Sequence, residues 1–307
     1  MHSQSNSKFL AIVNPAAGGG RSGKLVGPAL DRLRSAGLEF EVMRTGRPGD
    51  ATVIAREAFA NGWRQFLAVG GDGTSYEIVN GVFPAAQNVG EREPPVLGFL
   101  PLGTGNSFLR EFSKSGLKHA TESLIAGRRR ACDVLRLTHK AGVLYYINLL
   151  SVGFAADVAA ERIRRFGGVG ELGYLLALFT RLVRLKRRAF PLVVDGDAKP
   201  DLRRCLFLTF NNSKFTGGKM MIAPKAEIAD GLLEYVRWGP ISRLGLLRNL
   251  HTLYDGSHLK HPLAERRATR EINFDLDAPV DVMVDGEVLT LHCEKIDVLP
   301  NALEVVA

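Results

Sequence analysis

Residues 66–81 encode a strand, a glycine turn and the start of a helix, and this unit constrains the fold more than any other segment. Residues 66–69 are a short apolar run, which is typical of a buried strand. The run ends at Gly-Gly-Asp-Gly-Thr, residues 70–74, whose glycines permit a tight turn. Thr74 followed by Glu77 is a capping-box pattern, which predicts a helix N-terminus after the turn. The unpaired N–H groups of such a terminus suit phosphate.

Asp72 lies among these glycines. A carboxylate would repel a phosphate unless a divalent cation stood between them, so the segment indicates Mg²⁺ and a nucleotide together. The alternative is an ordinary strand-to-helix turn in which Asp72 caps the helix. A motif of this length is a hypothesis until its structural setting is known.

The size and charge of the chain give the next constraints. The 307 residues exceed what one hydrophobic core usually holds, which predicts two domains. The formal net charge is +8, with basic clusters at 128–130, 162–165 and 181–188. Such clusters favour an anionic partner, either nucleic acid or a membrane surface, although each is also typical of a solvated helix face.

Cysteine usage and the N-terminus bear on localisation. The three cysteines lie far apart and form no Cys-x-x-Cys pair, which indicates a reducing compartment and argues against a zinc site. The N-terminus is polar through Lys8, and no apolar run approaches the roughly 18 residues of a spanning helix. We therefore expect a cytoplasmic protein.

The N-terminal part repeats the strand–loop–helix order. A strand at 8–13 precedes a glycine loop and a helix at 22–35, a strand at 39–44 precedes a helix at 51–61, and a strand at 96–100 precedes a loop at 101–106 and a short helix at 107–112. Residues 18–24 nearly spell a P-loop, but Leu25 stands where its metal-binding hydroxyl belongs. This order predicts a doubly wound, mostly parallel α/β domain. One nucleotide would bind between Asn14, residues 70–74 and residues 103–106, at the carboxyl ends of the strands.

From residue 132 onward the pattern changes to strands with few helices between them. The predicted strands are 133–138, 143–150, 190–194, 203–210, 232–237, 271–275, 280–284 and 288–292. They favour a mainly antiparallel β domain, interrupted by helical segments at 155–188 and 242–254. We place the domains at 1–132 and 133–298, with an interdomain cleft.

With these motifs in order, the chain resembles the soluble lipid kinases with a diacylglycerol-kinase catalytic domain, which include bacterial diacylglycerol kinases and sphingosine kinases. The motifs that carry the resemblance run over nearly the whole chain: Asn14-Pro15-Ala-Ala-Gly-Gly, Gly70-Gly-Asp-Gly-Thr74, Glu77-Ile-Val-Asn-Gly81, Pro101-Leu-Gly-Thr-Gly-Asn106, Ser151-Val-Gly-Phe154, Ile222-Ala-Pro224, Asp230-Gly-Leu232 and Val284-Asp-Gly-Glu287. The resemblance implies an ATP-dependent lipid kinase acting on a hydroxyl such as that of diacylglycerol. It also implies that residues 299–307 return to the first domain.

The resemblance assigns roles residue by residue. ATP would be held by Asn14, Arg21, Thr45, Gly71, Gly73, Thr74, Glu77, Gly103, Thr104 and Asn106. Asp72 and Asp133 would belong to the Mg²⁺ network, Glu287 would be the general base, and a second Mg²⁺ would lie near Asp230 and Glu234. The chain departs from the family at Ala229 and Glu234, where relatives often have aspartates, and at Ser75, Tyr76 and Ser107, which replace a commoner Leu-Asn and Asp.

Other interpretations of these residues stay open. Asp-Gly occurs at Asp195, Asp230 and Asp285, and each pair is also typical of a plain hairpin turn. The catalytic interpretation is supported only by a general requirement: phosphoryl transfer to an alcohol needs a metal and one carboxylate near the hydroxyl. The competing functions are a sphingoid-base or other lipid kinase, a NAD kinase, and a non-catalytic nucleotide sensor or membrane-binding protein. Nucleic acid is disfavoured because no aromatic-interleaved basic motif accompanies the charge clusters.

The segment 174–188 predicts contact with a membrane. Tyr174, Leu175, Leu178, Leu182 and Leu185 fall near one helix face, and basic residues gather towards the end, at Arg181, Arg184, Lys186, Arg187 and Arg188. An apolar face bordered by cations fits a helix at a lipid interface, whereas the alternative is a core-packed helix with a solvated basic end. We therefore expect a peripherally membrane-associated enzyme with a lipid substrate. A homodimer is also compatible with the family.

Overall fold

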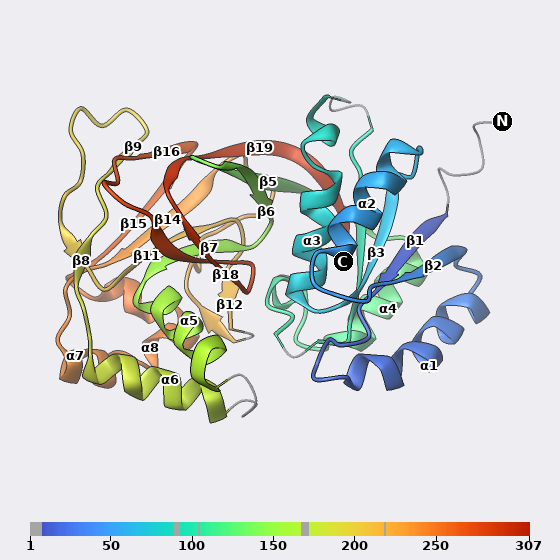
Figure 1. Cartoon of the computed structure of the whole chain (residues 1–307), viewed down its shortest axis with the longest axis horizontal. Coiled ribbons are helices and arrows are strands. Elements are labelled where there is room, and N and C mark those ends of the chain that lie inside the picture. The colour runs from blue at the N-terminus through green and yellow to red at the C-terminus, as the bar shows by residue number, and fades with distance from the viewer. Residues whose placement is uncertain (1–7, 89–92, 104, 167–171, 218) are drawn as a thin grey trace.

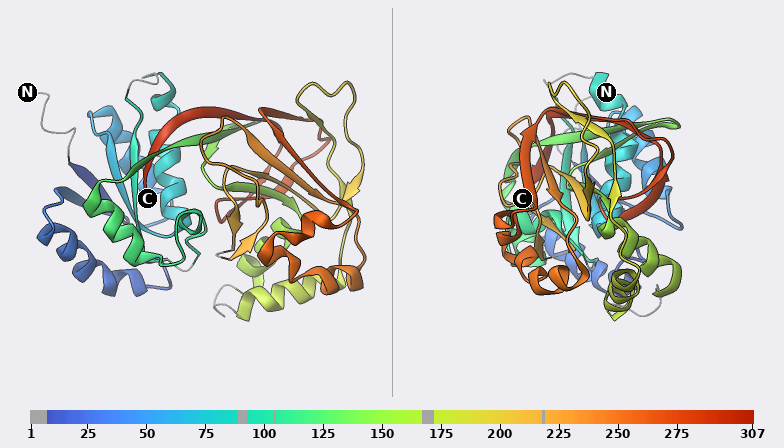
Figure 2. Two further views of the ribbon diagram at one scale, coloured as in Figure 1. Left: turned by 180° about the vertical axis from the view of Figure 1, so that it is seen from behind. Right: turned by 90° about the vertical axis from the view of Figure 1, so that its left-hand side faces the viewer.

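The computed structural model describes residues 8–88, 93–103, 105–166, 172–217 and 219–307 and shows two lobes (Figure 1). The first lobe holds the N-terminal strands and helices, and the second holds most of the later strands. Two long strands, β5 (Arg129–His139) and β19 (Cys293–Val306), connect them (Figure 2). The predicted fold class, a parallel α/β unit with a separate antiparallel β unit, is confirmed.

The first lobe is a parallel sheet with helices on both faces. Its strands lie in the order β2-β1-β3-β4. Helices α2 and α3 pack around the cluster containing Phe66, and α1 and α4 pack on the opposite face around Leu67. Because both faces of β3 are covered, its sequence is an unbroken apolar run. The bounds are β1 (Phe9–Val13), α1 (Arg21–Ser35), β2 (Phe40–Arg44), α2 (Asp50–Ala60), β3 (Gln65–Gly70), α3 (Asp72–Val82), η1 (Ala85–Asn88), β4 (Val96–Pro101), η2 (Phe108–Glu111) and α4 (Leu117–Ala126).

The second lobe is a sandwich of two sheets. One has the order β15-β14-β11-β7-β17-β18, and it packs on the distal strands of the long sheet around Leu208, Val282 and Ile296. The strand bounds are β6 (Gly142–Tyr146), β7 (Leu149–Gly153), β8 (Arg188–Ala189), β9 (Leu192–Val194), β10 (Arg204–Cys205), β11 (Phe207–Asn211), β12 (Phe215–Thr216), β13 (Met220–Met221), β14 (Leu233–Trp238), β15 (Ala264–Thr269), β16 (Glu271–Phe274), β17 (Val280–Val284) and β18 (Glu287–Leu291).

Helices cover the outer face of this sandwich. They are α5 (Phe154–Phe166), α6 (Leu172–Val183), α7 (Arg243–Asn249), α8 (Thr252–Asp255) and η3 (Ser257–Lys260), packed around Phe207 and Trp238. The prediction of a helix up to residue 188 is wrong, because α6 ends at Val183. Arg188 instead starts β8, and its guanidinium binds the buried carboxylate of Asp157 on α5 at 2.6 Å.

The strands that join the lobes pair with each other. β19 runs antiparallel to β5, and its last residues lie parallel to β4, with Glu304 opposite Val96. The β5–β19 register shifts between Leu299 and Leu303, where the chain passes from one lobe to the other. A division at residues 132 and 133 falls inside β5, so the domain boundary stays a prediction.

Candidate functional site

Loops that follow the four parallel strands start side by side at one edge of the sheet. Val13 at the end of β1 lies opposite Arg44 of β2 and Val69 of β3, and Gly70 lies opposite Pro101 of β4. Ligands bind at this edge in open α/β sheets. The structure therefore brings together the predicted nucleotide residues of all four loops. That they bind ATP stays a prediction.

The turn after β3 packs closely on the loop after β4. Gly70 O accepts hydrogen bonds from Leu102 N at 2.8 Å and Gly103 N at 2.9 Å. An ideal Cβ on Gly103 would lie 2.6 Å from Gly71 Cα, and one on Gly70 would lie 2.2 Å from Thr74 Oγ1. The two loops approach this closely only because these positions are glycines.

The predicted capping box of α3 is wrong. The helix begins at Asp72 without a side-chain cap. The Glu77 side chain lies at the start of α2 instead. Its two carboxylate oxygens accept hydrogen bonds from Gly49 N and Ala51 N, both at 3.0 Å. Glu77 therefore orders the neighbouring loop and leaves the N-terminus of α3 uncovered.

Two helix N-termini at this edge each carry a buried hydroxyl. Thr74 Oγ1 in α3 and Ser22 Oγ in α1 have no hydrogen-bond partner among the described residues. α1 follows Gly18, Gly19 and Gly20, which all have positive φ, and an ideal Cβ on Gly19 or Gly20 would meet no atom within 4 Å. Buried polar groups normally find partners, so an orphaned hydroxyl at each terminus fits phosphate oxygens and hence ATP.

The other predicted nucleotide residues shape their own loops. Asn14 Oδ1 accepts Ala16 N at 3.0 Å, Thr45 is buried with its hydroxyl 3.4 Å from Val13 O, and Asn106 Nδ2 donates to Gly103 O at 3.0 Å. Thr104 lies outside the described residues. Arg21 begins α1, and the position of its side chain is not described.

Asp72 lies half-buried between the two packed loops. Its Oδ2 accepts Ser107 N at 2.9 Å, so it caps η2 rather than α3. An ideal Cβ on Gly105 would lie 2.8 Å from the same oxygen. Burial raises the pKa of Asp72 against the opposing effect of these N–H donors.

Glu287 comes from the other lobe to the start of α3. It follows a two-residue hairpin turn between β17 and β18, in which Asp285 and Gly286 have φ of 45° and 93°. An ideal Cβ on Gly73 would lie only 2.6 Å from Glu287 Oε1. The hairpin interpretation of this Asp-Gly pair is thus correct, and the same turn delivers Glu287 to the predicted phosphate site. Desolvation, with a smaller contribution from Glu77, raises the pKa of Glu287.

Asp285 is a residue that the sequence alone did not single out. Its buried carboxylate accepts Ile147 N at 3.0 Å, Asn148 N at 3.2 Å and Leu149 N at 2.9 Å. These bonds break the strand predicted over 143–150 into β6 and β7, and they fix the turn that carries Glu287. Burial, with a smaller contribution from the charge of Asp72, raises the pKa of Asp285 to about 7 despite the three donors. The Asp-Gly pair was its only signal.

The acidic groups at this site suit a divalent cation. Asp72, Asp285 and Glu287 all have raised pKa values, and no Lys or Arg of the described residues is among the causes of the three shifts. Among the described residues, no three metal-ligating side chains converge on one point. Mg²⁺ is commonly held by one or two carboxylates together with substrate phosphates and water, so Asp72 fits as its protein ligand.

Asp133 lies at the junction of the lobes. It is fully buried, and its oxygens accept Asn301 N and Gly231 N, both at 2.7 Å. Its own N–H donates to Ile228 O at 2.6 Å. The structure thus places Asp133 in the packing of β5 against β19 and the 228–231 loop, whereas Asp72 has a different hydrogen-bond partner, Ser107 N.

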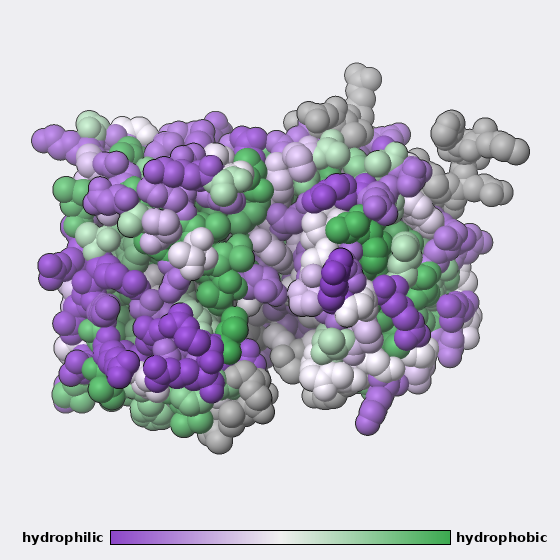
Figure 3. Space-filling view, viewed as in Figure 1, coloured by the Kyte–Doolittle hydropathy of each residue, from purple (hydrophilic) through white to green (hydrophobic). Residues whose placement is uncertain are grey.

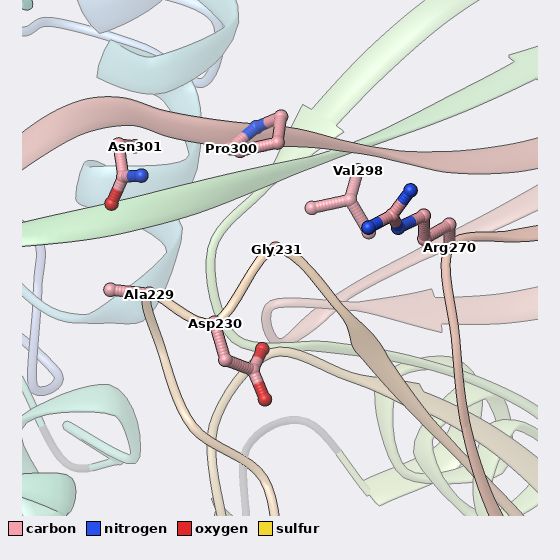
Figure 4. Close-up of a pocket in the computed structure, with 7 residues that line it drawn as sticks. All are labelled: Ala229, Asp230, Gly231, Arg270, Val298, Pro300 and Asn301. Carbon is pink, nitrogen blue, oxygen red and sulfur yellow. The ribbon is translucent and has the colours of Figure 1, made fainter.

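Asp230 and Glu234 have different surroundings. Asp230 lines a cavity of about 350 Å³ with Arg270 and Asn301 (Figure 4). Glu234 is buried, and both of its oxygens bind the guanidinium of Arg266. A carboxylate neutralised in this way is a poor metal ligand, so the expected pairing of Asp230 with Glu234 at a second Mg²⁺ is not supported by the geometry.

Comparison with known proteins agrees with this architecture. Residues 8–137 match the family model of the diacylglycerol kinase catalytic domain, and residues 148–307 match that of the YegS C-terminal NAD kinase beta sandwich-like domain. A diacylglycerol kinase of Mycobacterium tuberculosis (strain CDC 1551 / Oshkosh) is 29% identical over 302 residues, covering 97% of this chain and 94% of its own. One from Staphylococcus aureus (strain MRSA252) is 29% identical over 280 residues, covering 90% and 84%.

Solved structures share the fold. A crystal structure of a diacylglycerol kinase from Bacillus anthracis str. Sterne, 19% identical, superposes with a TM-score of 0.70 over 98% of this chain and 96% of its own. Another structure from the same organism, 21% identical, gives 0.74 over 98% and 97%. The chain belongs to the family that joins a diacylglycerol kinase catalytic domain to a YegS-type C-terminal domain, and it is a lipid kinase by family.

Proposed function

We propose that the chain transfers the γ-phosphoryl group of ATP to a hydroxyl of diacylglycerol. The observation that carries this proposal is the position of Glu287 Oε1 against Gly73, at the uncapped N-terminus of α3. A carboxylate from one lobe thus faces the phosphate turn of the other. The acceptor would enter between the lobes.

The residues divide the chemistry among them. The N-termini of α1 and α3 would hold the phosphates, and Asp72 would hold the Mg²⁺ that offsets their charge. Glu287 takes the proton of the acceptor hydroxyl, and because its pKa is raised it is a stronger base than an ordinary glutamate. Asp285 holds Glu287 in place through the turn.

The acceptor is tested by supplying labelled ATP with diacylglycerol, a sphingoid base, ceramide or NAD in separate reactions. Preferential labelling of diacylglycerol supports the proposal. Preferential labelling of the sphingoid base or ceramide would assign another lipid kinase, and labelling of NAD alone would overturn the lipid acceptor. The NAD kinase stays the weaker alternative although the C-terminal family model is named for a NAD kinase-like sandwich.

We further propose that α6 and α7 contact the membrane. No helix in the described part of the chain is long and apolar enough to cross a bilayer. α6 and α7 lie next to each other at the edge of the second lobe, and Figure 3 shows apolar residues there beside hydrophilic ones. The exposed apolar side chains include Phe179 at 57% and Val183 at 69% on α6, and Leu244 at 57% on α7. Such a face with basic neighbours fits an anionic lipid surface.

Not every predicted basic residue is available for this contact. Arg181 pairs with buried Glu161 at 2.7 Å, Arg188 with Asp157, and Arg187 Nε donates to Ile241 O at 2.9 Å. Arg184 and Lys186 are exposed.

Sedimentation with anionic vesicles tests the contact. We expect binding that weakens with salt and with Arg184→Gln/Lys186→Gln. The matched control removes the same charge from exposed Lys24 and Arg32 on α1 of the other lobe. Equal loss in both variants would show a general charge effect and contradict the α6–α7 contact. The homodimer stays a prediction.

A further inference from the structure

One face of α3 is turned towards the second lobe. Gly73, Tyr76 and Asn80 are three and four residues apart and therefore share a side of the helix. Gly73 meets Glu287 at one end of this face. At the other end, Asn80 Oδ1 accepts Tyr145 N at 2.9 Å and Asn80 Nδ2 donates to Tyr145 O at 2.8 Å. Both ends are fixed against the second lobe, so Tyr76 between them also faces that lobe, where the charges of Asp285 and Glu287 act on its hydroxyl.

The ring and the hydroxyl of Tyr76 have different surroundings. The ring is partly buried and packs against the core of the second lobe, although Tyr76 belongs to the first. The hydroxyl has no hydrogen-bond partner among the described residues. Burial raises its pKa, as do the charges of Asp285, Glu287 and Glu77, so the phenol stays protonated and is a donor.

We propose that the Tyr76 hydroxyl donates a hydrogen bond to the acceptor lipid, at an oxygen next to the hydroxyl that is phosphorylated. Tyr76 lies three residues further along α3 than Gly73, about 4.5 Å along the axis, and its hydroxyl is close enough to Glu287 to be affected by that charge. The adjacent oxygen of a diacylglycerol is an ester oxygen, which accepts but does not donate. A protonated phenol therefore matches it, whereas a carboxylate would repel it.

This inference rests on the proposed lipid-kinase function and adds a residue that determines acceptor binding. Removing the Tyr76 hydroxyl while keeping the ring would remove the proposed hydrogen bond to the lipid.

The test is Tyr76→Phe, which keeps the ring packing, with Tyr145→Phe as the matched control. Tyr145 is also at the lobe boundary, and its hydroxyl accepts a hydrogen bond from Gln87 Nε2. We expect Tyr76→Phe to raise KM for diacylglycerol in mixed micelles roughly tenfold, the loss of about 1.4 kcal/mol, with KM for ATP and the pH profile unchanged. Tyr145→Phe should leave the lipid KM unaltered.

The outcomes separate the two proposals. An unchanged lipid KM in Tyr76→Phe, with normal turnover by the wild type, overturns the role of Tyr76 and leaves the lipid kinase standing. A shifted acid limb without a change in KM shows that the hydroxyl acts on Glu287, and this also overturns it. A wild-type protein that phosphorylates no lipid overturns both.

Discussion

Asp133 and Glu287 are both carboxylates that the sequence placed in the active centre, and the structure surrounds them differently. Asp133 is fully buried, and each of its oxygens accepts a backbone N–H. Glu287 is exposed and accepts no hydrogen bond from the described residues. A carboxylate that must take a proton needs a free oxygen facing its substrate, and only Glu287 has one. The hydrogen bonds of Asp133 instead join β5 to β19 and to the 228–231 loop.

The largest loss of activity is expected when the proposed metal ligand is removed. Asp72→Ala should abolish turnover, because no other carboxylate lies among the phosphate-binding glycines. The loss is measured as the rate of ATP-dependent lipid phosphorylation, with circular dichroism to show that the fold is kept. Near-normal activity would remove Asp72 from the Mg²⁺ site.

The second change acts on the base itself. Glu287→Gln should lower kcat by about 10²–10⁴, the usual contribution of a general base, while ATP affinity changes little. In the wild type the rate should rise with pH through a pKa above the ordinary glutamate value, because the base must be deprotonated. Loss of ATP binding, or an unaltered rate, would reduce Glu287 to a hairpin residue.

The pKa of Asp285 depends on two opposing effects, burial and hydrogen bonding, and the third test measures which of them is larger. Its pKa is about 7 in the folded chain and about 4 in the unfolded one, so folding favours the protonated form. This stabilisation is complete below about pH 4 and is lost as pH rises towards 7. The free energy of unfolding of the wild type, relative to Asp285→Asn, should therefore fall over this range by roughly a few kcal/mol. An opposite slope would show that the three N–H donors outweigh burial.

The sequence predicted some parts of this site and not others, for physical reasons. Local patterns revealed the glycine turn at 70–74 and the strand before it, because turn geometry and burial depend on adjacent residues. The capping box failed because Glu77 found donors on α2, 26 to 28 residues away. Asp285 was overlooked because its three donors lie more than 130 residues earlier in the chain. Contacts between the lobes leave no periodic signal in the sequence.

The smallest effect on the rate is expected from a substitution at the buried carboxylate, Asp133. Asp133→Asn keeps one acceptor oxygen but turns an amide N–H₂ towards a backbone N–H that now has no partner. Leaving one buried donor unsatisfied costs about 1–3 kcal/mol, so we expect the free energy of unfolding to fall by this amount in urea denaturation. The rate per folded molecule should stay within about twofold, because Asp133 touches the junction of the lobes and not the phosphate turn. A rate loss like that of Glu287→Gln, with stability unchanged, would return Asp133 to the Mg²⁺ network and remove the distinction between the two carboxylates.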